Sequence, residues 1–314
     1  MNKIKIGVKI LKLLTFSIKG EYSRVGILTS IGILDLPNAY KKAYDCVEAP
    51  DFFYSMRKFI TFEELSFNIA KELLNKSLKL NDMSLFIDPK EVKWEPPVPN
   101  PEKVFCVAIN YREHSKESGA SPPPKPYFFP KFASALIGHE NPIIKPKISE
   151  KVDWEVELGV VIGKAGKYID KKDALNHVFG YTVVNDISMR DWQYPPAESL
   201  GFYWIWGKSM DSTTPVGPYI VTKDEIPNPN NLRLTLKVNG NIEQDGNTRN
   251  LIFNIEDLIH WASQGVTLRP GDYISTGTPS GVGMSKNKFL KHGDVVEAEV
   301  ENIGILRNSV ISEV

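Results

Sequence analysis

Two glutamates on one side of a predicted strand are the first residues of this chain that could do chemistry. Glu155 and Glu157 lie in the stretch 153–164, where β-branched residues and bounding glycines predict a strand that enters a buried sheet. Side chains alternate along a strand, so both carboxylates point the same way. On a solvated face this alternation is ordinary, whereas in a pocket the pair would repel unless a cation lay between them.

A third carboxylate follows near the end of the next predicted strand, Val178 to Ser188. Asp186 needs a reason to be there, because aspartate is disfavoured within strands, and a role beside Glu155 and Glu157 would supply one. Three carboxylates call for a hard cation. Ligation by oxygen alone, with positions left for water and substrate, fits Mg²⁺ or Mn²⁺, and Ca²⁺ fits less well because it takes more ligands.

A histidine and a glutamate three residues apart form a second candidate group. On a helix His114 and Glu117 would lie on one face and could hydrogen-bond. A histidine oriented by a carboxylate can serve as a general base, and the alternative is a solvated polar turn. The remaining histidines have no such partner and are expected to be structural or surface residues: His139, His177, His260 and His292.

A lysine and a glycine-rich turn complete the candidates. Lys208 follows aromatic residues and Gly207, where the chain could approach a ligand closely, and its ammonium could stabilise an oxyanion, although most lysines are merely solvated. The turn 277–283 lacks the Gly-Lys-Ser/Thr ending of a phosphate-binding loop. We expect it instead to present backbone amides and Thr278 to a substrate carboxylate.

The elements that must position these residues are mostly strands. Alternating runs from Leu11 to Leu36 predict a small antiparallel meander, and apolar residues at helical spacing predict a helix over Phe62 to Leu80. A proline-rich break over 95–101 then excludes both helix and central strand, and it predicts a domain boundary. Beyond the break, strands are expected at 104–109, 218–221, 232–238, 272–276 and 295–301, helices at 171–177 and 255–263, and a short polar helix or turn at 110–119.

The segment 193–206 is unusually aromatic. Such residues would suit a loop over a pocket, and they would equally suit a corner of the core.

Composition excludes several classes of partner. The 314 residues contain 38 basic and 38 acidic side chains, so no charge excess indicates nucleic acid or an anionic membrane as a partner. Lysines interrupt the apolar start of the chain, which lacks the uninterrupted apolar stretch of a signal peptide or membrane span. With only Cys46 and Cys106, no disulfide framework is expected. The simplest expectation is a cytoplasmic protein.

Taken in order, several motifs resemble the fumarylacetoacetate hydrolase family. The matching stretches are 107–114, 153–158, 185–191, 206–211, 268–272 and 276–283, with Gly293-Asp294 near the end. They run from about Lys103 to the C-terminus, and their joint order is far more specific than any one of them. The resemblance implies an α+β, mostly β fold, with a mixed β-sheet roll at 99–314 and a smaller α/β N-terminal domain at 1–98.

The resemblance also implies roles for individual residues. Glu155, Glu157 and Asp186 would hold the metal, and His114 with Glu117 would form a water-activating dyad beside Lys208. The implied substrate-binding residues are Tyr111, Arg112, Lys131, Arg190, Gln193 and Thr278. Members of the family usually form homodimers and act on small 2-oxo acids.

The first functional hypothesis is a metal-dependent hydrolase that cleaves a carbon–carbon bond in acylpyruvate-type or fumarylpyruvate-type diketo acids. Its alternatives are isomerisation or decarboxylation of a 2-hydroxydienedioate, sugar-acid dehydration, and a non-enzymatic module in which a cation only braces two strands. The long aromatic segment 193–206 departs from the family pattern and would border the pocket, so substrate specificity is not carried over from any one relative. Pro130 before Lys131 also differs from the usual apolar residue, although Lys131 itself matches.

Overall fold

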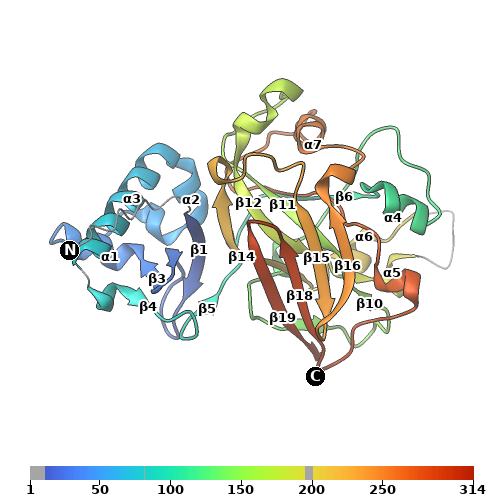
Figure 1. Ribbon diagram of the computed structural model, residues 1–314, viewed down its shortest axis with the longest axis horizontal. Helices are drawn as coiled ribbons and strands as arrows, with labels where there is room; N and C mark the ends of the chain where they lie inside the picture. The colour runs from blue at the N-terminus through green and yellow to red at the C-terminus, as the bar shows by residue number, and fades with distance from the viewer. Residues whose placement is uncertain (1–10, 81, 195–200) are drawn as a thin grey trace, which may run out of the picture.

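The structure is a computed structural model that describes residues 11–80, 82–194 and 201–314 (Figure 1). The strands are β1 (Lys12–Ser17), β2 (Arg24–Thr29), β3 (Gly32–Asp35), β4 (Phe86–Ile87), β5 (Lys93–Trp94), β6 (Val104–Ala108), β7 (Tyr127–Pro130), β8 (Leu136–Ile137), β9 (Ile143–Lys145), β10 (Val152–Asp153), β11 (Val156–Ile162), β12 (Val178–Asn185), β13 (Ser188–Met189), β14 (Thr214–Thr222), β15 (Arg233–Val238), β16 (Asn241–Asn247), β17 (Tyr273–Ser275), β18 (Val295–Val300) and β19 (Gly304–Ser312). The α-helices are α1 (Leu36–Ala43), α2 (Met56–Thr61), α3 (Glu63–Leu80), α4 (Arg112–Glu117), α5 (Arg190–Gln193), α6 (Trp204–Lys208) and α7 (Ile255–Ala262).

A twelve-stranded mixed sheet runs through the described residues. Its main path is β4-β3-β2-β1-β14-β12-β11-β17-β6-β7, with β5 paired to β1 and β8 paired to β14. Most neighbours are antiparallel, while β17 with β6 and β14 with β8 are parallel. A five-stranded sheet, β16-β15-β18-β19-β9, forms a second layer. The predicted α+β, mostly β fold is therefore confirmed.

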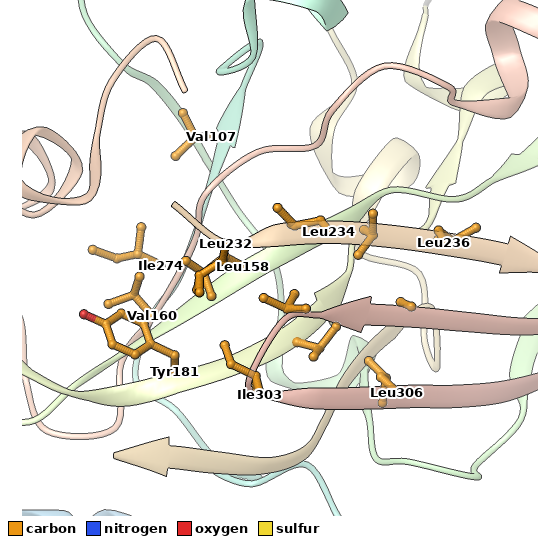
Figure 2. Close-up of a cluster of buried hydrophobic side chains, with 14 of the residues drawn as sticks. Val107, Leu158, Val160, Tyr181, Leu232, Leu234, Leu236, Ile274, Ile303 and Leu306 are labelled. Atoms are coloured by element: carbon orange, nitrogen blue, oxygen red, sulfur yellow. The ribbon is translucent and has the colours of Figure 1, made fainter. Parts of the chain in front are cut away.

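The core lies on both faces of the large sheet. Figure 2 shows Leu158, Val160 and Tyr181 of the large sheet in one apolar cluster with side chains of the second sheet such as Leu234. Alternate residues of the same strands, among them Val161, belong to a separate cluster with the N-terminal helices. Every residue of β11 and β12 is consequently buried, which is why these strands read as nearly continuous apolar runs.

The N-terminal segment is tied to the rest of the chain through the large sheet. Strands β1 to β3 form the predicted antiparallel meander, and helices α1 to α3 gather beside them at one end of the molecule (Figure 1). Strand β1 pairs with β14, and Lys12 lies opposite Val221. The same sheet therefore contains residues from before and after the proline-rich break at 95–101. The division into 1–98 and 99–314 stays a prediction. In the part of the chain that the structure describes, no helix combines the length and the apolar character that a bilayer crossing needs.

Three expected elements differ in detail. The strand expected at 153–164 is two strands, β10 and β11, so Glu155 lies in the gap between them and does not share a strand face with Glu157. The strand expected at 178–188 likewise divides into β12 and β13, and Asp186 lies in the gap. Residues Lys171–His177 form a 3₁₀ helix. Sequence periodicity predicted the apolar strands correctly but could not show where the backbone leaves the sheet.

Candidate active site

Three carboxylates converge where β11 begins and β12 ends. Glu155, Glu157 and Asp186 each offer one oxygen, and these oxygens all lie within 4.8 Å of one another. The register explains the meeting, because Val156 lies opposite Asn185 and the residues just outside this pair come side by side. The amide of Asp186 donates to the carbonyl oxygen of Glu155 at 2.9 Å and fixes the gap. All three side chains are buried.

Three buried cations neutralise two of these carboxylates. Lys208 donates to Glu155 at 2.6 Å and to Asp186 at 2.8 Å, Lys131 donates to Asp186 at 2.5 Å, and Arg190 donates to Glu155 at 2.5 Å. Burial by itself would raise the pKa of Glu155, but the charges of Lys208 and Arg190 outweigh it and lower that pKa. Burial would lower the pKa of Lys208, but Asp186 and Glu155 raise it. Glu155 and Lys208 are therefore charged at neutral pH.

Glu157 has no cationic partner among the described residues. One of its oxygens accepts hydrogen bonds from the hydroxyl of Ser275 at 2.5 Å and the amide of Gly277 at 2.8 Å. Burial, with the negative charges of Asp186 and Glu155, raises the pKa of Glu157 to about 8. A divalent cation between the carboxylates would remove this repulsion, and a donor set made only of oxygen suits a hard cation. The residues present therefore fit a divalent metal.

The predicted dyad is formed on α4. Nδ1 of His114 lies 3.1 Å from Oε2 of Glu117, and both side chains are half-buried. Oε1 of Glu117 accepts from the amide of Gly281 at 2.9 Å and from the hydroxyl of Ser285 at 2.7 Å. Burial would raise the pKa of Glu117, but the hydrogen bonds from His114, Ser285 and Gly281 outweigh it and lower that pKa. An ionised Glu117 can orient the imidazole as a general base requires.

The glycine-rich loop holds carboxylate side chains of the site. Its glycine amides donate to three carboxylates, Gly277 to Glu157, Gly281 to Glu117 and Gly283 to Asp153. Gly281 has a φ of +100°, and a Cβ there would lie 2.2 Å from the carbonyl oxygen of Glu243, so only glycine fits. These three amides therefore serve acidic side chains of the protein, and the expectation that the turn presents amides and Thr278 to a substrate carboxylate stays a prediction. The hydroxyl of Thr278 donates to the carbonyl oxygen of Val156.

Asp153 is a site residue that the sequence analysis missed. It is fully buried and accepts hydrogen bonds from Nε of Arg190 at 2.8 Å and from the amides of Gly283 at 2.6 Å and Met284 at 3.0 Å. The signal that singled out Asp186, an aspartate within a predicted strand, applied equally to Asp153.

A cavity of about 410 Å³ opens beside these groups. Of the predicted site residues, those in its lining are His114, Glu117, Glu155, Glu157, Arg190, Gln193, Lys208 and Thr278. Lys131 and Asp186 are buried, where they pair with each other. Tyr111 is buried, and its hydroxyl has no hydrogen-bond partner among the described residues. Arg112 is exposed, and neither residue contributes to the lining. The predicted roles of all these residues stay predictions.

Part of the aromatic segment forms a wall of the cavity. Tyr194, Phe202 and Trp204 line it, as a loop over a pocket would, whereas Trp206 is exposed and does not. Residues 195–200 of the segment lie outside the described part of the chain. The other four histidines bond to backbone groups, as expected of structural or surface residues.

The chain is similar to a known protein family and to a named human protein. The family model described as fumarylacetoacetate (FAA) hydrolase C-terminal matches residues 103–311. The human protein named oxaloacetate tautomerase FAHD2A, mitochondrial, is 44% identical over 259 residues, which are 82% of this chain and 80% of the human protein.

Two solved structures have a similar fold. A putative HpcE protein from Mycobacterium smegmatis has a TM-score of 0.78 and 33% identity, over 96% of this chain and 99% of that one. Maleylpyruvate hydrolase from Sphingobium sp. SYK-6, in complex with manganese(II) ion and pyruvate, has a TM-score of 0.75 and 28% identity, over 96% of this chain and 100% of that one.

Proposed function

Because the chain belongs to the fumarylacetoacetate hydrolase family and is an enzyme of that family, we propose that it interconverts the keto and enol forms of a 2-oxo acid, with oxaloacetate as the first substrate to test. The observation that supports this proposal is that the histidine–glutamate dyad lines the same cavity as Glu155 and Glu157, two members of the acidic cluster that Asp186 completes. The name of the relative that is 44% identical supports the choice of oxaloacetate.

In this proposal Glu155, Glu157 and Asp186 hold the cation, with Mg²⁺ or Mn²⁺ as the candidates and Ca²⁺ as a third. When bound, a divalent cation supplies Lewis-acid polarisation of the carboxylate and keto oxygens of a 2-oxo acid. Lys208, which bridges Glu155 and Asp186, adds positive charge beside the same oxygens and stabilises the negative charge that develops there.

Proton transfer is the step that the dyad performs. His114 takes the proton from C3 of the keto form and returns it to the keto oxygen, so a C–H bond breaks, an O–H bond forms and the double bond moves to C2–C3. Glu117 holds the imidazole in place and stabilises its charged form, as its contact with Nδ1 permits. The reverse sequence converts the enol to the keto acid, and no water molecule is consumed.

Hydrolysis of an acylpyruvate, the first hypothesis from the sequence, is the second candidate. The same dyad could take a proton from water instead of carbon, and the pyruvate-bound relative is named a hydrolase. Isomerisation of a 2-hydroxydienedioate needs the same proton transfer as tautomerisation. The bracing-module alternative is set aside, because the relatives are enzymes and Glu155 and Glu157 line a cavity that a substrate can enter.

The test supplies the metal-free protein with Mg²⁺ or Mn²⁺ and follows two reactions. We expect the metal-loaded protein to accelerate the decay of the ultraviolet absorbance of enol-oxaloacetate. Chelation of the metal and the variant His114→Asn should each abolish this acceleration. His292→Asn, a histidine outside the cavity lining, is the matched control. Metal-dependent pyruvate release from acylpyruvates, without any effect on enol-oxaloacetate, would replace tautomerisation by hydrolysis.

The substrate class, the oligomeric state and the cellular location of the protein stay predictions. The proposed substrate is a small 2-oxo acid, and the homodimer implied by the resemblance awaits a measurement of mass in solution. The human relative is mitochondrial by name, so the comparisons do not support the expected cytoplasmic location.

A further inference from the structure

The wall of the cavity beside the carboxylates is a row of aromatic rings. Phe129 stacks on Trp204 with ring centroids 4.3 Å apart and planes at 9°. Phe202 follows at 5.1 Å from Trp204, and Tyr194 lies 5.3 Å from Phe202. All four rings line the cavity. Phe129 lies on β7, Tyr194 directly follows α5, Phe202 precedes α6 and Trp204 begins it, so the fold brings separate segments together to build one apolar surface.

This row begins directly beside the candidate metal site. The ammonium of Lys208, which bridges Glu155 and Asp186, lies 5.3 Å from the centroid of Phe129. A 2-oxo acid with its polar head near these carboxylates would therefore bring a C3 substituent as large as a ring within reach of the aromatic row, whereas the short C3 substituent of oxaloacetate would stay in the head site.

The outer rings of the row are exposed. The side chain of Phe202 is 40% exposed and that of Tyr194 is 44% exposed. Both rings therefore have apolar surface that a bound ligand could bury. Large aromatic side chains gain free energy when another ring stacks on them and removes them from water. Because both rings line an open cavity, a ligand bound there would bury them.

Charge at the aromatic end argues against a second carboxylate there. The cations in the described lining are Arg190 and Lys208, and both pair with buried carboxylates. His114 is paired with Glu117. An anionic group among the rings would lose its hydration without gaining an unpaired cation, whereas an uncharged ring would lose nothing.

We propose that this cavity accepts 2-oxo acids with an aromatic group on C3, the arylpyruvates, and that Trp204 is the residue that determines this specificity. The inference rests on the proposed tautomerase function for its chemistry. As before, a proton leaves C3 and one is added to the keto oxygen, and the enol formed is conjugated with the aryl ring. Small 2-oxo acids use the same head site without touching the row.

The experiment compares phenylpyruvate with oxaloacetate on the full chain loaded with Mn²⁺. Enol decay gives kcat/KM for each substrate, and calorimetry gives the dissociation constant of phenylpyruvate without requiring turnover. Trp204→Ala is the test variant. Trp206→Ala is the matched control, because Trp206 lies on the same helix, is 52% exposed and is absent from the cavity lining.

Trp204→Ala should lower the ratio of kcat/KM for phenylpyruvate over oxaloacetate by about fivefold to tenfold and weaken phenylpyruvate binding to a similar extent. Trp206→Ala should leave both unchanged. Phe202→Ala, at the exposed end of the row, should lower the ratio by about threefold and serves if Trp204→Ala does not fold.

Two results overturn the inference: wild-type protein that does not bind phenylpyruvate, or a substrate ratio and a phenylpyruvate affinity that Trp204→Ala or Phe202→Ala leaves intact. Failure of the proposed function looks different. In that case neither enol decays faster, while calorimetry still shows whether phenylpyruvate binds in a manner that depends on Trp204.

Discussion

Asp153 accepts a hydrogen bond from Nε of Arg190 at 2.8 Å, and the same guanidinium donates to Glu155 at 2.5 Å. Asp153 also accepts from the amide of Gly283, in the loop 281–285 that holds Glu117. One buried aspartate therefore joins the carboxylate site to the loop behind the dyad. It binds neither substrate nor metal in our assignment, and its role is to position the groups that do.

Asp153→Asn should destabilise the protein by about 3 kcal/mol, because it leaves the buried guanidinium of Arg190 with one carboxylate partner fewer. Asp191→Asn, at a neighbouring aspartate that accepts hydrogen bonds from Ser149 and Glu150, is the matched control and should cost about 1 kcal/mol or less. Urea unfolding of both variants measures the difference. Equal losses of unfolding free energy in the two variants would show that the contacts of Asp153 stabilise the protein no more than those of Asp191.

Glu117→Gln should lower kcat for enol-oxaloacetate by about 10² to 10⁴-fold, because glutamine can still accept from the loop but cannot stabilise a charged His114. KM should change little. Glu113→Gln, an exposed glutamate on the same helix, is the control. Stopped-flow absorbance gives both constants, and a fully active Glu117→Gln would remove the dyad from the mechanism.

Glu157→Gln should stabilise the metal-free protein at high pH. The pKa of Glu157 is about 8 in the folded state and 4.5 when unperturbed, so the folded state holds this proton more tightly than the unfolded state does. The stability of metal-free wild type therefore falls as pH rises from about 4.5 to about 8, and glutamine escapes that loss. The Tm of the metal-free variant should exceed that of wild type at pH above about 8, and the gap should shrink toward pH 5. A gap independent of pH would contradict the assignment.

Chelation should lower the Tm of wild type, and Mg²⁺ or Mn²⁺ should restore it. At a free metal concentration about 100 times the Kd, binding stabilises a folded protein by about 2.7 kcal/mol. Glu155→Gln should abolish this response, because it removes a ligand and unbalances the charges of Lys208 and Arg190. Glu150→Gln, at an exposed carboxylate, should respond like wild type. Differential scanning calorimetry with and without metal decides between these outcomes.

Several features of the site were readable in the chain because they depend on local spacing. His114 and Glu117 are one helical turn apart, so their contact follows from helix geometry once α4 forms. The apolar runs around Val160 and Val183 predicted buried strands for the same kind of reason. The role of the glycine-rich loop was not predictable in this way, because its partners Glu117, Asp153 and Glu157 come from distant parts of the chain.

The sequence by itself determined the inventory: three acidic residues, a dyad at helical spacing, a lysine and an aromatic segment, in the order of one enzyme family. Only the tertiary structure decided which carboxylate has no cationic partner among the described residues and which rings face the cavity. Glu157 and Trp204 illustrate both points. The physical reason is that pairing and burial depend on side chains brought together by strand register, and a one-residue change in register turns every side chain of a strand to its other face.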